Sequence, residues 1–243
     1  VDGKPFLILG GEFGNSSASS REYMRGKWPK LQAMHLNTVL APVEWDLIEP
    51  QQGRFDFASV DGLLEDARAH QMHLVLLWFG TWKNSMSSYV PGWVKRDTRR
   101  FPRTTGADGR AQEIVSASSI AARDADARAF ATLMRHLREI DGDKHTVLMV
   151  QVENEVGFLP FAREGGNGSD LSADERGAAS AYARYVEAVA KAGKREYPLP
   201  MYVNGAQARP NAKPGDSPSG GPLAHLAGEW RKGAPSLDFL APD

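Results

Sequence analysis

The chain has 243 residues, 42% of them hydrophobic and 24% charged, a composition typical of a globular protein with one large domain or two small ones. Its 29 basic and 30 acidic residues give a net charge of −1, which disfavours nucleic acid or an anionic membrane as a partner and indicates a neutral substrate. Cysteine is absent, so disulfides and thiol catalysis are excluded. No segment approaches the roughly 18 apolar residues of a membrane span.

The chain begins at Val1 without a methionine and without a signal peptide in front of it. A start of this kind is typical of a trimmed chain, so we expect a fragment of a longer protein. The cellular location stays open, with the periplasm or the exterior favoured over the cytoplasm.

The first half of the chain alternates short apolar runs with helical patterns. Strands are expected at residues 4–12, 37–45 and 73–80, and helices at 21–35 and 60–70. Pro42 should mark the end of the second strand or a bulge in it. The segment 85–122, rich in Ser, Arg and Gly, is too long for an ordinary connection and is expected to be an elaborated loop.

The second half continues the same alternation. A helix from residue 124 or 126 to 140 precedes a strand within 145–157. A loop over 158–172, a helix over 173–196 and a strand over 200–204 come next. After a loop over 208–221, a short helix over 223–231 and a sixth strand over 237–241 end the series.

Strands that alternate with helices predict a parallel α/β protein. A doubly wound sheet is the competitor, but the first strand lacks the glycine-rich dinucleotide fingerprint, and polar residues end nearly every strand. We therefore predict a (β/α)₈ barrel that is incomplete at its carboxyl end, with about six of the eight strands present.

The segment around the fourth strand carries the clearest chemical signal. A β-branched apolar run ends abruptly in Glu153, Asn154 and Glu155, followed by Gly157. In an α/β barrel, polar residues at the carboxyl ends of strands face the substrate. Alternation places Glu153 and Glu155 on one face and Asn154 on the other, unless the strand bulges there. The alternative is a strand that simply leaves the core and meets solvent.

At this point the sequence resembles a known family. Residues 151–157, Gln-Val-Glu-Asn-Glu-Val-Gly, are similar to the fourth-strand signature of glycoside hydrolase family 35, the β-galactosidases, in the clan of (β/α)₈ retaining glycosidases. Residues 43–50 and 53–57 resemble the family's second-strand segment, and Pro-Gly-Trp at 91–93 resembles its Pro-Ala-Trp. The resemblance is strong from about residue 6 to residue 157.

The resemblance implies a function for the motif. Glu155 would be the general acid/base of a retaining double displacement on a terminal β-galactoside, and Asn154 would hold the sugar 2-hydroxyl. The family takes its nucleophile from strand seven, which is expected beyond residue 243. Residues 1–243 would then be a glycosidase catalytic domain that lacks strands seven and eight and is inactive alone.

Three departures from the family pattern bear on specificity. Pro42 stands where the family has Tyr, Glu44 stands where it has Pro, and Lys83-Asn84-Ser85 replaces Ala-Glu-Trp. Another β-glycoside, such as a plant cell-wall oligosaccharide, is therefore an alternative substrate. Another retaining enzyme of the clan (β-glucosidase, mannanase or xylanase type) and a non-catalytic carbohydrate-binding barrel stay open.

The remaining site predictions fall at strand ends. Besides Asn154, the substrate-binding candidates are Glu12, Glu44, Trp45, Trp82, Lys83, Asn84 and Asn204. Glu153 is expected to support Glu155, because the Asn-Glu order selects Glu155 as the acid. Trp78 fits the core or a sugar face, and Asp243 is a further strand-end candidate.

No metal or cofactor is expected. The six histidines are scattered and show no HExxH spacing, and no Gly-x-Ser-x-Gly elbow is present. The expected partner is a carbohydrate, and the oligomeric state stays open.

Overall fold

The computed structural model describes residues 1, 3–106, 108–159, 171–213 and 218–243. Its centre is a sheet of six strands in the order β1-β2-β3-β6-β7-β8, in which all neighbours run parallel. The strands are β1 (Gly10–Glu12), β2 (Thr38–Glu44), β3 (His73–Lys83), β6 (Val147–Asn154), β7 (Met201–Gly205) and β8 (Phe239–Pro242).

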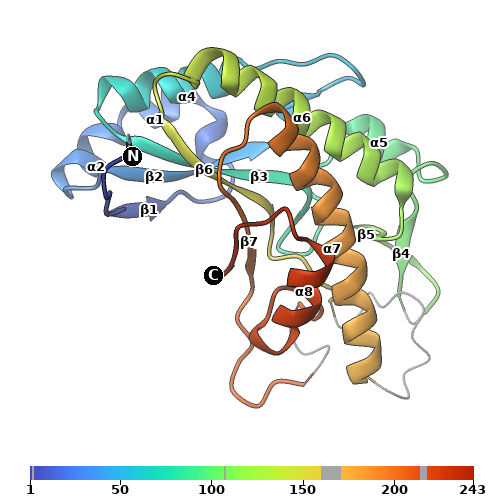
Figure 1. Ribbon diagram of the computed structural model, residues 1–243. Coiled ribbons are helices and arrows are strands. Elements are labelled where there is room, and N and C mark those ends of the chain that lie inside the picture. Colours follow the sequence, from blue (N-terminus) through green and yellow to red (C-terminus); the bar gives the residue numbers. More distant parts are fainter. Residues whose placement is uncertain (2, 107, 160–170, 214–217) are drawn as a thin grey trace.

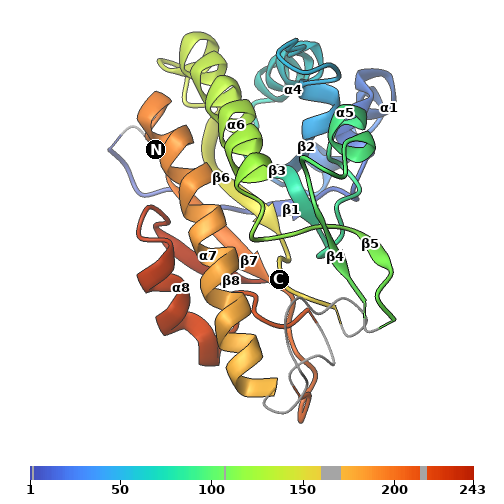
Figure 2. The same ribbon diagram turned by 90° about the vertical axis from the view of Figure 1, so that its right-hand side faces the viewer.

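Helices cover one face of this sheet. The α-helices are α1 (Arg21–Arg25), α2 (Trp28–Ala33), α3 (Trp45–Ile48), α4 (Ala58–Ala69), α5 (Gly92–Arg96), α6 (Ile120–Asp141), α7 (Leu171–Glu196) and α8 (Ala227–Gly233). Short 3₁₀ turns lie at Ser17–Ser19 and Ala224–Leu226. The sheet curls, since β7 stands steeply to β2 and β3, and α6 and α7 run side by side over it (Figures 1 and 2). The fold is a partial barrel of the (β/α) type, as the sequence predicts.

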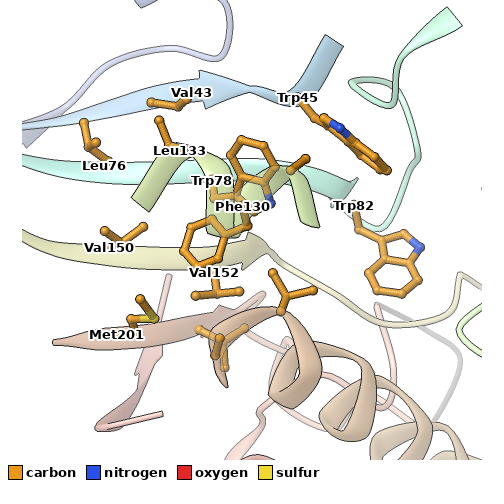
Figure 3. Close-up of a cluster of buried hydrophobic side chains, with 14 of the residues drawn as sticks. Val43, Trp45, Leu76, Trp78, Trp82, Phe130, Leu133, Val150, Val152 and Met201 are labelled. Carbon is orange, nitrogen blue, oxygen red and sulfur yellow. The ribbon is translucent and has the colours of Figure 1, made fainter. Parts of the chain in front are cut away.

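The main core lies between the sheet and these helices (Figure 3). Alternate strand residues turn to this face, for example Val43 on β2, Leu76 and Trp78 on β3, and Val152 on β6. They meet helix residues such as Phe130 of α6, whose ring lies 5.5 Å from that of Trp78. Burying side chains of this size contributes about 1.5–3 kcal/mol each, so this layer holds the strands in place.

The other face, here called the inner face, carries a smaller apolar cluster made by Val75, Leu77, Phe79 and Tyr202. A groove of about 310 Å³ runs over the inner face and is lined by residues of β1, β2, β3, β6, β7 and β8. Apolar side chains are open to solvent at both edges of the sheet, with Ile8 37% and Phe239 43% exposed.

Several predicted elements are corrected. The first strand is confined to Gly10–Glu12, and the expected helix 21–35 is two helices. Gly26 ends α1, and Pro29 enters the first turn of α2, where a missing N–H costs nothing.

Pro42 neither ends β2 nor makes a bulge, because it pairs with Leu77 in a regular register. Leu40 accepts a hydrogen bond from the amide of Phe13, on the β1 side. Two residues further on, Pro42 faces the same side past the end of β1, so its missing N–H breaks no ladder bond.

The segment 85–122 contains more structure than a loop. It holds α5 and an antiparallel pair of strands, β4 (Arg103–Thr105) and β5 (Ala111–Val115). Helix α6 begins at Ile120, because the Ser119 hydroxyl accepts a hydrogen bond from the amide of Ala122. Residues 160–170 of the predicted loop 158–172 lie outside the described part. Within the described residues, none of the helices is long and apolar enough to cross a membrane.

Candidate active site

The carboxyl end of β6 departs from simple alternation. Glu153 and Glu155 both adopt left-handed backbone conformations, with φ values of 63° and 46°, which residues other than glycine rarely adopt. The two carboxylates consequently point in different directions. Glu153 is fully buried between β3 and α6, whereas Glu155 faces the residues that end β1, β3 and β8.

Glu155 lies among polar and charged groups. The Lys83 ammonium is 4.0 Å from Glu155 Oε2, and the Asn84 side-chain amide donates a hydrogen bond to the same oxygen. A further hydrogen bond joins the carboxyl groups of Glu155 and Asp243. The Ser85 hydroxyl donates to the Glu155 carbonyl oxygen at 2.7 Å, which fixes the backbone.

These neighbours set the protonation of Glu155. Burial raises the pKa of Glu155 most, and the Asp243 carboxylate raises it further. Lys83 lowers the pKa of Glu155 and Glu12 raises it, each by less. A carboxyl group whose pKa is raised keeps its proton nearer to neutral pH and can donate it to a leaving group.

A tight turn presents Asn84 to Glu155. The peptide groups of Lys83 and Met86 exchange hydrogen bonds of 2.8 and 3.0 Å, and the two residues between them have φ values of 50° (Asn84) and 62° (Ser85). Two consecutive left-handed residues are the geometry of a type I′ turn, in which Asn is favoured. The predicted candidates Lys83 and Asn84 therefore do lie at Glu155.

Asn204, at the end of β7, links the backbone of Glu155 to the side chain of Asp243. Its Oδ1 accepts the peptide N–H of Glu155 at 2.9 Å, and its Nδ2 donates to Asp243 Oδ1 at 2.7 Å. Both polar atoms are thus engaged and the side chain is 2% exposed. Asn204 therefore contacts Glu155 and Asp243, and it also lines the groove of the inner face, so its predicted contact with sugar stays a prediction.

Asn154, the other half of the Asn-Glu pair, is buried at the end of β6. Its Oδ1 lies 3.4 Å from the peptide nitrogen of Asn84, which donates to it weakly. The predicted contact of Asn154 with a sugar 2-hydroxyl stays a prediction.

The tryptophans predicted at the sugar, Trp45 and Trp82, are fully buried in the core. Trp82 is fully buried, donates its Nε1–H to the Val115 carbonyl and packs edge-on against Tyr182 and Tyr185 of α7. Trp45 is equally buried and donates to Glu49. Figure 3 shows Trp45, Trp78 and Trp82 with the hydrophobic core on the helix side of the sheet. They are core residues because helices α5, α6 and α7 supply aromatic partners for them on that face.

The two remaining acids differ in position. Glu12, exposed at the end of β1, interacts electrostatically with Lys83 and Asp243, and its pKa is raised by burial first and by Asp243 second. Glu44 is 6% exposed at the end of β2, and its Oε1 has no hydrogen-bond partner among the residues that the structure describes. Burial and the nearby Asp46 raise the pKa of Glu44 to about 7.

Sequence reasoning missed one participant, Asp126, and considered it only as a helix start. In the structure Asp126 lies on α6 beside Glu153, and both carboxyl groups are fully buried. Glu153 contacts Asp126 and accepts the peptide N–H groups of Thr81 and Trp82 on β3, and its predicted support of Glu155 stays a prediction. No group of three or more His, Asp or Glu residues in the described ranges is arranged to hold a metal ion.

Comparison with known proteins bears on this site. The profile of the glycoside hydrolase family 42 β-galactosidases matches residues 16–162. A β-galactosidase of Xanthomonas manihotis is 37% identical over 78 residues, which cover 31% of this chain and 13% of that protein. The human β-galactosidase-1-like protein 3 is 36% identical over 109 residues, which cover 43% of this chain and 16% of that protein. The chain thus matches about one seventh of the length of these relatives.

Solved structures share the fold. The cold-adapted β-galactosidase of Rahnella sp. R3 superposes with a TM-score of 0.68 at 15% identity, over 97% of this chain and 39% of that one. The catalytic domain of the Paenibacillus polymyxa β-amylase gives a TM-score of 0.68 at 10% identity, over 96% and 75%. An exo-β-1,4-mannosidase of Opitutaceae bacterium strain TAV5 gives 0.60 at 15%, over 98% and 38%. These structures show the shared fold alone, whereas the profile match over more than half of its residues shows that the chain belongs to the glycoside hydrolase family 42 β-galactosidases.

Proposed function

We propose that the chain carries the acid/base half of a retaining β-galactosidase, with Glu155 as the general acid/base. The observation that supports this role most directly is the setting of Glu155, a mostly buried carboxyl group that is hydrogen-bonded to Asp243 and has a raised pKa. In the first step its proton would go to the glycosidic oxygen. In the second step its carboxylate would take a proton from the attacking water.

The nucleophile of this mechanism would come from elsewhere. A retaining enzyme needs a second carboxylate about 5–5.5 Å from the acid. The motif 151–157 resembles glycoside hydrolase family 35, whose nucleophile ends strand seven, so we place the nucleophile after residue 243. On this proposal residues 1–243 alone do not hydrolyse a β-galactoside.

A β-galactoside is the favoured substrate. The relatives with 36–37% local identity are named β-galactosidase and β-galactosidase-1-like protein, and the matching family is one of β-galactosidases. Lys83 and Asn84 stand beside the acid, so they are the side chains that we expect to contact the sugar.

The test is hydrolysis of an aryl β-galactoside by the full-length gene product, beside its Glu155→Gln variant. Gln keeps the shape and removes the titrating proton, and loss of general acid/base help costs about 10²–10⁴-fold in rate. Azide should partly restore the second step of the variant. Glu187→Gln on α7, where the carboxylate caps Ser236 away from this site, is the matched control.

The outcomes separate the alternatives. A wild-type rate that Glu155→Gln does not change contradicts the assignment of the acid. Turnover of aryl β-glucosides, β-mannosides or β-xylosides in place of the galactoside would identify another retaining glycosidase specificity of the same clan. Binding of sugar without turnover of any of them indicates a carbohydrate-binding barrel.

A further inference from the structure

Two carboxyl groups face each other behind the ends of β3 and β6, where no solvent reaches them. Asp126 of α6 accepts hydrogen bonds from Trp78 Nε1 at 2.8 Å and from the Thr81 hydroxyl at 2.8 Å. Glu153 Oε2 accepts the peptide N–H of Trp82 at 2.6 Å. The peptide N–H of Thr81 is shared between the two acids, at 3.0 Å from Asp126 Oδ2 and 3.1 Å from Glu153 Oε1.

The pair has a hydrogen bond between its carboxyl groups but no cation to balance two charges. Within the described ranges, neither acid forms an ion pair with Lys, Arg or His. Two further titratable groups lie nearby. The hydroxyl of the buried Tyr185 of α7 is 2.7 Å from that of Thr81, and the charge of Arg123 on α6 lowers the pKa of Tyr185. Two adjacent buried carboxylates cannot both ionise, so one proton must lie between them.

The backbone of β3 is shaped to admit this pair. A Cβ atom at Gly80 would come within 2.6 Å of Glu153 Oε1 and 2.8 Å of Asp126 Oδ1, and would also strike Trp78 Nε1. The absence of a side chain at residue 80 therefore brings both carboxyl groups against the two peptide N–H groups that follow.

We propose that Asp126 and Glu153 are positioning residues that share one proton and, by binding the peptide N–H groups of Thr81 and Trp82, fix the turn that carries Lys83 and Asn84 against Glu155. A role of this pair in catalysis rests on the proposed function of Glu155, whereas the shared proton and the fixed turn rest on the contacts alone. The sequence spacing supports the fixed turn, because Trp82, whose peptide N–H binds Glu153, immediately precedes Lys83.

Infrared spectroscopy of the protein at about pH 9 tests the shared proton, because exposed carboxyl groups and Glu44 are ionised there. The wild type should retain a carbonyl band of a protonated carboxyl group. Asp126→Asn and Glu153→Gln should each lose it, since the introduced amide can hydrogen-bond the remaining carboxylate. Absence of the band from the wild type, or a band of undiminished intensity in both variants, overturns the shared proton.

Asp141 provides a matched control at the opposite end of β6. It is also a fully buried carboxylate that accepts two peptide N–H groups, from Thr146 and Val147, but it pairs with Arg68 and lies far along the strand from Glu155. Asp141→Asn should lower stability and leave the infrared band in place.

Amide hydrogen exchange tests the fixed turn without reference to turnover. In Glu153→Leu the Trp82 amide loses its acceptor, and its exchange should speed up by about 10–100-fold, the equivalent of one lost buried hydrogen bond. The Leu74 amide, which donates to Thr146 at the other end of β3, should change much less. Glu153→Gln should restore slow exchange at Trp82. Equal acceleration at Trp82 and Leu74 would show a loss of global stability only, and refute positioning.

Kinetics of the full-length gene product complete the test. Glu153→Leu should lower kcat/KM for an aryl β-galactoside on the order of 10²-fold, the effect of a small misplacement of catalytic groups, and Glu153→Gln should recover most of it. Asp141→Asn should retain the wild-type kcat/KM. A catalytically normal Glu153→Leu variant with local exchange at Trp82 refutes the link to catalysis. A wild type without turnover contradicts the proposed function, while the infrared and exchange results still decide the positioning.

Discussion

Lys83 and Glu155 face each other at the ends of β3 and β6, with the ammonium nitrogen 4.0 Å from Glu155 Oε2. Both side chains are mostly buried, so their interaction is weakly screened. The pKa of each depends on the other, because Lys83 lowers the pKa of Glu155 while Glu155 opposes the lowering of the Lys83 pKa by burial.

The pH dependence of turnover should reveal this pair. If Glu155 must be protonated to act as acid, its pKa sets the alkaline limb of kcat/KM. Lys83→Met removes a nearby positive charge and should move that limb to higher pH by about one unit. Glu12→Gln removes a negative charge and should move it to lower pH. Shifts in the same direction in the two variants would contradict the assignment.

Asn204 should be important for stability as well as for the acid. Asn204→Ala leaves the peptide N–H of Glu155 and the Asp243 carboxylate without their partner, and should lower the free energy of unfolding by about 1–3 kcal/mol. Urea unfolding measures this. Asn15→Ala, at an exposed position, is the control and should change the free energy by less than about 0.5 kcal/mol. Equal stabilities of the two variants would exclude a structural role for Asn204.

Glu44 should make the protein less stable as the pH rises. Its pKa is raised from 4.5 to about 7 in the folded state, so the folded protein binds its proton more tightly than the unfolded chain does. The loss of unfolding free energy that ionisation of Glu44 causes is absent below about pH 4.5. It grows between about pH 4.5 and 7 and is complete above 7, at about 1–3 kcal/mol. Glu44→Gln should flatten the pH profile of unfolding in that window. Parallel profiles of variant and wild type would show that Glu44 does not titrate in this way.

Gly80 should tolerate no side chain. Gly80→Ala places a methyl group against Glu153 and Asp126 and should lower stability by about 1–3 kcal/mol or more, as overpacking does. Gly177→Ala is the matched control on α7, where an added Cβ meets nothing within 4 Å, and it should be neutral or stabilising by up to about 1 kcal/mol. Thermal unfolding of the two variants decides the comparison.

The sequence was sufficient to predict the class of fold and the position of the central motif. Short continuous apolar runs identified the strands, because nearly every residue of the central strands β2 and β3 is buried. The sequence could not show that Glu153 and Glu155 diverge, since left-handed conformations at two non-glycine residues have no signature. The order of Asn154 and Glu155 selects Glu155 as the acid, and that assignment stays a prediction.

The failed predictions involve long-range contacts. Trp82 precedes the polar pair Lys83-Asn84 and so was predicted to lie at the site, yet Tyr182 and Tyr185 cover it from a helix about one hundred residues later. Asp126 carries no local mark of its pairing with Glu153, because α6 and β6 meet only in the folded chain. Such burial depends on which helix covers which strand, and helix-by-helix pattern reading does not contain that information.

The left-handed conformations of Glu153 and Glu155 at the end of β6 also imply that random mutations at these two positions have different effects. Residues 153 and 155 are only two codons apart in the gene, but Glu153 is packed between β3 and α6, whereas Glu155 faces Lys83, Asn84 and Asp243. In a library that randomises both codons, substitutions at Glu153 should reduce the amount of soluble protein recovered. Substitutions at Glu155 should yield well-folded protein in normal amounts that is silent in an activity screen. If the library is sorted first for expression and then for turnover, variants at Glu153 should be lost in the first sort and variants at Glu155 in the second.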